Sequence, residues 1–148
     1  MSRAQPWFRP AAAVAAALAA AAAAVPAWAG DLTVRITGVR GGDGAVTADL
    51  WRGPDGFRDT DRTVRSASQP ARDGAVEIGF RDLAPGRYAV IAYHDANGSG
   101  DLDRFFGMWP TEGWGLSNDP EVSGPPDFDP AAFVLPGAAP VVEITLNY

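Results

Sequence analysis

Residues 76–94 read VEIGFRDLAPGRYAVIAYH and contain two expected β-strands with a turn between them. In the first, apolar side chains occupy every second position, at Val76, Ile78 and Phe80. A period of two is typical of a strand with one buried and one solvated face. Pro85 presets φ for the first central position of a turn, and Gly86 can adopt the positive φ that the second position requires. Residues 88–94 then predict the most apolar strand of the chain.

The same alternation recurs on both sides of this segment. It places apolar side chains at Leu32, Val34 and Ile36, at Val46, Ala48 and Leu50, and at Val142, Ile144 and Leu146. The glycine-rich residues 41–44 separate the first two of these strands, which predicts a hairpin. Residues 53–72 are polar and aperiodic, and we expect a short strand or a helical turn there because structureless loops of that length are uncommon. The pattern predicts an all-β fold, an antiparallel β-sandwich (Ig-like or transthyretin-like) of about seven strands.

The first 29 residues are typical of a secretory signal peptide. Arg3 and Arg9 precede an alanine-rich apolar stretch and give the chain a positively charged start. Ala27-Trp28-Ala29 has the small-x-small pattern that signal peptidase needs. The apolar run at residues 11–25 is shorter than the roughly 20 residues of a membrane-spanning helix. We therefore expect cleavage after Ala29, a folded domain over residues 30–148, no stable membrane insertion after cleavage, and a periplasmic or secreted location.

The composition limits the partners and cofactors. The chain has 18 acidic and 12 basic residues, a net charge of −6, one histidine and no cysteine. Its arginines are scattered rather than clustered, so nucleic acid is not an expected partner. The lack of cysteine excludes disulfides and thiolate chemistry, and a single histidine offers little to zinc or copper. The acidic balance suits a hard divalent cation better.

Residues 94–103, HDANGSGDLD, set oxygen-bearing side chains at alternate positions around glycines. Matched to the twelve-residue calcium loop, the ligand positions are Asp95, Asn97, Ser99, Asp101 and Asp103, with Gly100 at the sharp turn. The last position, which should be a bidentate Glu, is Phe106, so we expect Glu112, Asp119 or Glu121 to supply the missing ligand if the following segment folds back, and Glu112 is our first candidate. This predicts a weak calcium site, with a Kd of about 10⁻⁴ to 10⁻³ M. The alternative is a turn-rich hairpin in which Asp, Asn and Ser bond the loop backbone without metal.

His94, the only histidine, precedes this loop at the end of a predicted strand. We expect it to orient the loop through a hydrogen bond to a carboxylate or a backbone carbonyl, a structural role. A general acid or base role is the alternative. Further along the chain, residues 125–130, PPDFDP, are expected to form turn and cap positions before a short element through Phe133.

Residues 105–118, FFGMWPTEGWGLSN, combine aromatic rings with glycines and one carboxylate. One interpretation is a lid whose rings seal an end of the sandwich. Another is a carbohydrate-binding surface in which Trp109 and Trp114 stack on sugars. A third is a hydrolase with Glu112 and His94 at the mouth of the lid, although the sequence positions no second acid for a glycosidase pair.

Several motifs occur together in one order along the chain. They are Tyr88-Ala89-Val90, His94-Asp95-x-Asn97-Gly98-x-Gly100-x-Leu102-Asp103, Gly107, Pro110, Glu112-Gly113-Trp114-Gly115-Leu116-Ser117-Asn118 and Gly124-Pro125-Pro126-x-Phe128. This order resembles the bacterial family DUF2141, and the resemblance implies an exported bacterial domain without implying an activity. Separately, Phe80-x-x-Leu83-x-Pro85-Gly86-x-Tyr88 is similar to a turn-and-strand motif of transthyretin-like and carboxypeptidase-regulatory-like sandwiches. That similarity gives Pro85, Gly86 and Tyr88 structural roles and implies no activity.

Together these observations predict an exported, small β-sandwich that serves as a binding or structural module. Its expected cofactor is calcium, held in the loop at residues 95–103. Its expected partner is a cell-envelope glycan or protein. The alternative is a cell-envelope carbohydrate-binding module or hydrolase that uses residues 105–118, and we do not expect an enzyme.

Overall fold

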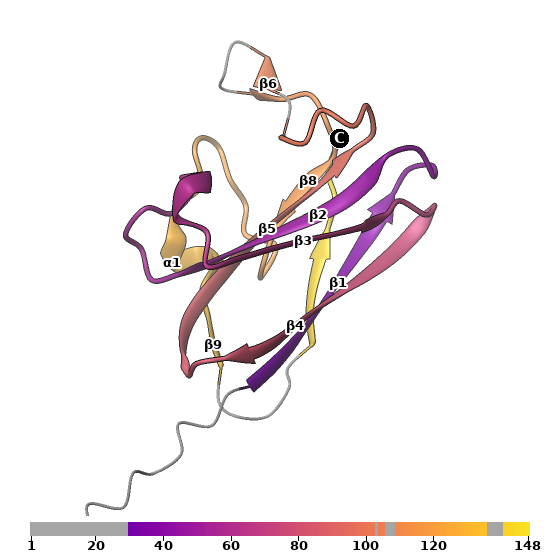
Figure 1. The fold of residues 1–148 in the computed structure, drawn as a ribbon. Helices are drawn as coiled ribbons and strands as arrows, with labels where there is room; N and C mark the ends of the chain where they lie inside the picture. Colours follow the sequence, from indigo (N-terminus) through magenta and orange to yellow (C-terminus); the bar gives the residue numbers. More distant parts are fainter. Residues whose placement is uncertain (1–29, 103, 106–108, 136–140) are drawn as a thin grey trace, which may run out of the picture.

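The structure is a computed structural model that describes residues 30–102, 104–105, 109–135 and 141–148. The expected signal peptide at residues 1–29 and the predicted ligand Asp103 lie outside these ranges. Two β-sheets pack against each other around a common core (Figure 1). The helical elements among the described residues are two short turns, η1 (Thr60–Arg62) and α1 (Phe128–Ala131). The prediction of an all-β sandwich is confirmed.

The first sheet has three strands in the order β10–β1–β4. Their bounds are Val141–Thr145 for β10, Gly30–Val39 for β1 and Gly74–Leu83 for β4. β1 runs antiparallel to β4, as expected, but parallel to β10. The sandwich is therefore rich in antiparallel pairs without being antiparallel throughout. A parallel neighbour needs a long crossover connection, and here that connection contains β4 and all the strands of the second sheet.

The second sheet has five strands, and β5 is its centre. The bounds are Arg65–Pro70 for β3, Ala45–Arg52 for β2, Gly86–Asp95 for β5, Trp114–Leu116 for β8 and Phe133–Leu135 for β9. β2 pairs with β5 along one edge, while β8 and β9 pair with successive parts of the other edge. A small hairpin of β6 (Arg104–Phe105) and β7 (Trp109–Pro110) stands apart from both sheets (Figure 1).

The predicted hairpin between residues 32–36 and 46–50 is wrong, because β1 and β2 belong to different sheets. Alternation reports which face of a strand is buried, and it does not identify the strand that bonds to its edge. The connection passes from one sheet to the other through Gly44, at φ +70. A Cβ on Gly44 would lie 2.0 Å from the carbonyl oxygen of Asp95, so this close approach requires glycine.

The turn before β5 also differs from the prediction. Gly86 does not take a positive φ, and the left-handed residue near this turn is Asp82, at φ 56. Gly86 begins β5 and lies against Arg52, whose Nε would be 2.9 Å from a Cβ at that position. The Arg52 guanidinium donates a 2.9 Å hydrogen bond to the carbonyl oxygen of Pro85. Space for an arginine, rather than backbone freedom, accounts for this glycine.

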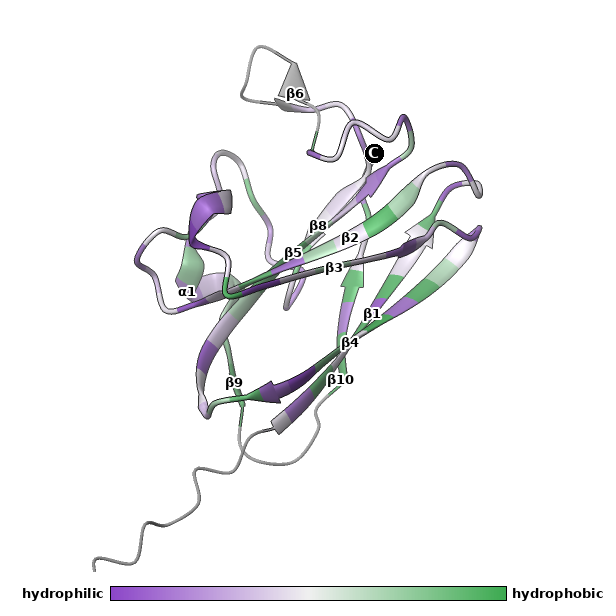
Figure 2. Cartoon of the chain, in the orientation of Figure 1, coloured by the Kyte–Doolittle hydropathy of each residue, from purple (hydrophilic) through white to green (hydrophobic). Residues whose placement is uncertain are grey.

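Residues 53–72 contain both of the elements considered for them, because η1 and β3 lie within that range. The main core lies between the sheets, where inward side chains of β1, β2, β4, β5 and β10 are buried. Figure 2 shows this along β1 and β4, where hydrophobic positions alternate with hydrophilic ones. Tyr88 joins the core and donates a 2.6 Å hydrogen bond from its hydroxyl to the carbonyl oxygen of Ala84. Tyr88 thus connects β5 to the preceding turn.

Candidate functional site

The outer face of the five-stranded sheet has two different ends. Ala45 pairs with Asp95 at one end of the β2–β5 ladder, and Arg52 pairs with Tyr88 at the other. Near the Arg52 end a second apolar cluster is buried on this face, formed by Trp51, Ala89, Ile91, Leu116, Phe128 and Ala131. Near the Asp95 end the face is polar, and the predicted calcium loop follows β5 there. We call this polar end the acidic end.

Asp95 organises the loop that follows it. Its side chain is buried, with 5% exposed. Oδ1 accepts a 2.9 Å hydrogen bond from the backbone N–H of Ser99, and Oδ2 accepts a 2.8 Å bond from the backbone N–H of Gly100. Asn97 Oδ1 also accepts from the Ser99 N–H, at 2.9 Å. Gly98 and Gly100 take φ values of 72° and 90°, so the loop winds around the Asp95 carboxylate.

The other predicted ligands are arranged less closely. Asn97, Ser99 and Asp101 are exposed, and the backbone carbonyl of Asp101 already accepts a 3.0 Å bond from the Ser99 hydroxyl. Glu112 is half-buried. Among the residues that the structure describes, no group of three or more His, Asp or Glu side chains is close enough to hold a metal ion. In the described geometry, backbone N–H groups converge on Asp95.

Two buried groups that the sequence did not single out lie on the same face. Asp49 on β2 is 6% exposed, and its Oδ1 accepts a 2.5 Å hydrogen bond from the Ser66 hydroxyl on β3. Burial raises the pKa of Asp49, against the lowering effect of the Ser66 bond, and the charge of Asp101 raises it further. The polar residues Thr47 and Asp49 at alternate positions of a buried strand were the available sequence signal.

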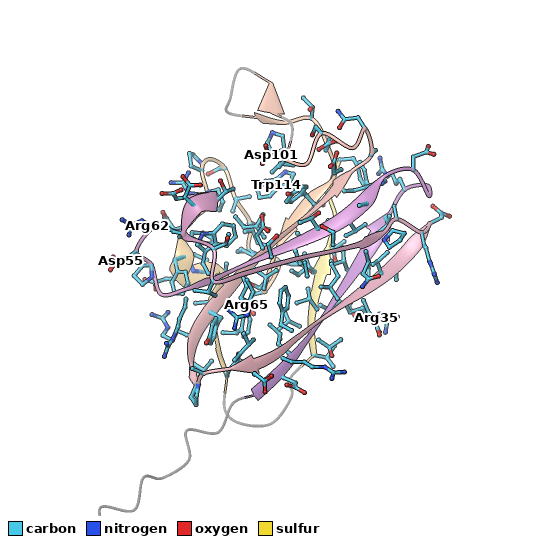
Figure 3. The ribbon with its side chains drawn as sticks, in the orientation of Figure 1. Arg35, Asp55, Arg62, Arg65, Asp101 and Trp114 are labelled. Atoms are coloured by element: carbon cyan, nitrogen blue, oxygen red, sulfur yellow. The ribbon has the colours of Figure 1, made fainter. Side chains whose placement is uncertain are left out.

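Tyr93 on β5 lies among these carboxylates. Its pKa is raised to about 12, mainly by burial and then by the charge of Asp49, with smaller effects of Asp101 and Asp95. Its hydroxyl donates a long, 3.4 Å hydrogen bond to the carbonyl oxygen of Gly100 in the loop. The negative charges of three aspartates therefore act together around one phenol. Figure 3 shows Asp101 above the same end of the sheet as Trp114, the β8 residue that pairs with Tyr93.

His94 is 2% exposed and faces away from this polar surface. Its Nε2 donates a 2.8 Å hydrogen bond to the carbonyl oxygen of Asp43, because a carbonyl can only accept. Nδ1 then accepts from the hydroxyl of Tyr148 at 2.9 Å. Both ring nitrogens are engaged, and His94 and Glu112 do not line one common open pocket among those described. The geometry of His94 is that of a structural connector between three segments.

The aromatic segment splits into parts with different environments. Trp114 is half-buried and packs against the apolar cluster of the outer face. The side chain of Trp109, one of the two proposed stacking platforms, lies outside the described part, as do Phe106, Gly107 and Met108. Gly113 and Gly115 are buried, and a Cβ on Gly115 would lie 2.4 Å from the carbonyl oxygen of Thr145. Gly115 lets β8 approach the last strand, and Gly113 leaves room for the ring of Tyr148.

Ser117, Asn118 and Asp119, directly after β8, connect neighbouring segments. Ser117 is fully buried, accepts a 3.0 Å hydrogen bond from the Val90 N–H and donates a 2.5 Å bond to the Ala131 carbonyl. Asn118, at φ 66, donates through Nδ2 to the carbonyls of Pro130 and Ala132, at 3.2 and 2.8 Å. Asp119 accepts hydrogen bonds from the backbone N–H and hydroxyl of Thr145, at 2.9 and 3.0 Å. The motif therefore has a structural function in this fold.

These features define a small all-β sandwich domain. Within the described ranges, no helix is both long enough and apolar enough to cross a membrane. The chain belongs to the family DUF2141, described as an uncharacterized protein conserved in bacteria, whose model matches residues 34–143. No curated protein and no solved structure matches the chain.

Proposed function

We propose that this domain is an exported binding module of the bacterial cell envelope whose loop at residues 95–103 takes up calcium. The concentration of negative charge at the acidic end supports this proposal. Asp49, Asp95 and Asp101 all raise the pKa of Tyr93, so their fields overlap there. A divalent cation near this point would reduce the repulsion among the three carboxylates.

The distribution of arginine supports the same location. In the described part of the chain the ion pairs are Arg62 with Asp59, at 3.9 Å, and Arg87 with Asp129, at 2.9 Å. Both belong to segments near the Arg52 end of the ladder, and Asp49, Asp95 and Asp101 form no ion pair with the side chains that the structure describes.

The loop would have to rearrange to hold the ion. Asp95 is already fixed in the centre by backbone N–H groups, and each carboxylate oxygen has a second lone pair for a cation. Asn97 would have to exchange its hydrogen bond with the Ser99 N–H for the ion, Asp101 would have to turn its exposed carboxylate inward, and Glu112 is the proposed additional ligand. An affinity of about 10⁻⁴ to 10⁻³ M is that of extracellular calcium modules, which suits the proposed export to the periplasm or medium. The proposed partner is an envelope glycan or protein.

The experiment is thermal denaturation of residues 30–148 with calcium or with chelator. For a Kd of about 1 mM, calcium at about 10 mM would stabilise the fold by about 1.4 kcal/mol through mass action. That corresponds to a rise of a few degrees in Tm. Magnesium at the same concentration serves as the ionic-strength control, since calcium accepts more ligands and looser geometry.

Asp95→Asn and Asp101→Asn should each reduce the calcium-dependent rise, because each removes one charge from the proposed site. Asp55→Asn, an exposed aspartate near the other end of the sheet, is the matched control and should leave the rise intact. Equal melting curves with calcium and with chelator for the unmodified domain would remove calcium from the proposal.

A further inference from the structure

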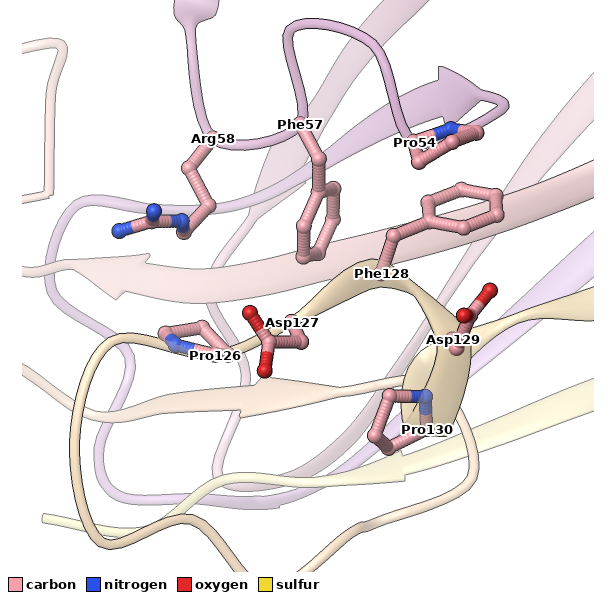
Figure 4. Close-up of a pocket in the computed structure, with 8 residues that line it drawn as sticks. All are labelled: Pro54, Phe57, Arg58, Pro126, Asp127, Phe128, Asp129 and Pro130. Carbon is pink, nitrogen blue, oxygen red and sulfur yellow. The ribbon is translucent and has the colours of Figure 1, made fainter.

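A separate hollow of about 370 Å³ lies at the Arg52 end of the sheet (Figure 4). One wall is the loop after β2, which contributes Pro54, Phe57 and Arg58. The other wall is residues 126–130, at the start of α1. Its volume falls in the range of small-molecule sites. The loop after β2 leaves the β2–β5 ladder at its Arg52 end, whereas the calcium loop follows Asp95 at the opposite end, so this hollow is separate from the proposed calcium site.

The walls are held in place by packing and hydrogen bonds. Phe57 contacts Phe128 edge to face, with ring centroids 5.6 Å apart, and contacts Trp51 in the same way at 5.4 Å. Trp51 also donates a 3.0 Å hydrogen bond from Nε1 to the carbonyl oxygen of Asp59, beyond Arg58. On the other wall, the Asn118 amide bonds the Pro130 carbonyl. A ligand would thus meet a preformed site and lose little free energy in ordering it.

Of the three charged side chains that line the hollow, Asp129 forms an ion pair, whereas Arg58 and Asp127 form none with the residues that the structure describes. Asp129 is paired with Arg87 at 2.9 Å. In the described part of the chain Arg58 and Asp127 form no ion pair, and Asp127 makes no side-chain capping bond at the start of α1. Figure 4 shows the Arg58 guanidinium and the Asp127 carboxylate on the same side of the Phe57 ring. One cation and one anion therefore border the hollow without neutralising each other.

The backbone of Arg58 adds a second, independent observation. Arg58 has φ 74, in the left-handed region that disfavours residues with a Cβ. Glycine would adopt this conformation at no steric cost, and both neighbouring glycines of the loop, Gly53 and Gly56, have positive φ. A strained residue that the surrounding structure maintains is a frequent feature of ligand sites. The strain is explained if the guanidinium serves a ligand.

From this geometry we infer that the hollow binds a small zwitterion with an apolar side chain, that is, an amino acid or a short peptide whose two ends are both free. Arg58 takes the carboxylate through paired N–H donors, and Asp127 takes the ammonium group. The apolar side chain contacts Phe57 and the proline rings of both walls. A ligand with only one of the two charges would leave the other protein group without its partner.

The test is calorimetric titration of the folded domain with L-leucine and with trileucine that has free ends. N-acetyl-leucine and leucinamide, which each lack one charge, are the matched ligands. We expect 1:1 binding of leucine or trileucine, and at least about tenfold weaker binding of both blocked ligands, because each loses a charge-assisted hydrogen bond. The tighter of the first two ligands distinguishes a free amino acid from a short peptide with both ends free.

Arg58→Gly is the decisive variant, because it relieves the left-handed φ and should melt no lower than the unmodified domain. It should nevertheless reduce affinity at least about tenfold, as should Asp127→Asn. Arg35→Gln, on the exposed face of β1, is the control and should bind normally. The inference is overturned if neither leucine nor trileucine binds, if a blocked ligand binds equally well, or if Arg58→Gly retains full affinity.

Discussion

The hydroxyl of Ser117 donates a 2.5 Å hydrogen bond to the carbonyl oxygen of Ala131. The hydroxyl oxygen of Ser117 also accepts a 3.0 Å hydrogen bond from the Val90 N–H. One fully buried serine thus joins β5 to the segment that carries α1 and forms a wall of the hollow. A serine followed by Asn and Asp after a short strand would ordinarily be expected in a solvated turn. Its burial makes it sensitive to substitution.

Ser117→Ala should lower the free energy of unfolding by about 1–3 kcal/mol, because the buried Val90 N–H and Ala131 carbonyl both lose their Ser117 partner. Urea denaturation measures this as a lower midpoint with an unchanged slope. Ser123→Ala, at an exposed serine, should change stability by less than about 0.5 kcal/mol. Equal midpoints for the two variants would contradict the importance of this connection.

Gly115→Ala should destabilise the domain by about 1–3 kcal/mol or more. The added Cβ would lie 2.4 Å from the Thr145 carbonyl oxygen and 2.7 Å from the side chain of Ile144, so β8 would have to move away from the last strand. Gly79→Ala is the matched control on β4, where a Cβ meets no atom within 4 Å and φ is not positive. A control as destabilised as Gly115→Ala would show that loss of glycine flexibility, rather than the contact, is responsible.

Asp49→Asn should raise Tm at neutral pH, because it removes a buried charge while keeping an oxygen to accept the Ser66 bond. The folded-state pKa of Asp49 is raised above 3.8, so its stabilising contribution is present at low pH and is lost as pH rises through the folded value. The gain from the substitution should therefore be smaller at about pH 3.5 than at about pH 7. If calorimetric scans show a gain in Tm that does not depend on pH, the raised folded-state pKa of Asp49 is contradicted.

Tyr93→Phe tests the other member of the acidic end. Burial raises the pKa of Tyr93 from 10.0 to about 12, so the stability that its neutral phenol contributes is intact below pH 10 and is lost as pH rises toward 12. Between these values the unmodified domain should lose stability more steeply than the variant does. Chemical denaturation at closely spaced alkaline pH values measures the two slopes, and parallel slopes would refute a raised pKa in the folded state.

The sequence predicted the elements of this fold better than their pairing. Val76, Ile78 and Phe80 identify β4 because a half-buried strand must alternate. Nothing local to Val141–Thr145 indicates that it lies parallel to β1, since that pairing depends on packing across the whole domain. The hairpin expected between β1 and β2 failed for the same reason.

The candidate site shows a similar division. The position of Asp95 at the end of β5 followed directly from its place after the apolar strand. Asp49 and Tyr93 come from different strands and meet only through the register of the β2–β5 ladder, which sequence patterns do not fix. Arg58 and Asp127 are even further apart in sequence, and the left-handed backbone of Arg58 has no sequence signature.

The parallel pair of β1 and β10 has a kinetic consequence. Thr37 and Thr145, which face each other in that register, are 108 positions apart in the chain. Closing so long a loop costs conformational entropy before any contact rewards it, and topologies of this kind fold slowly. We therefore expect the three-stranded layer to be completed late, so that a nascent chain shows an uncovered apolar face until its last strand arrives.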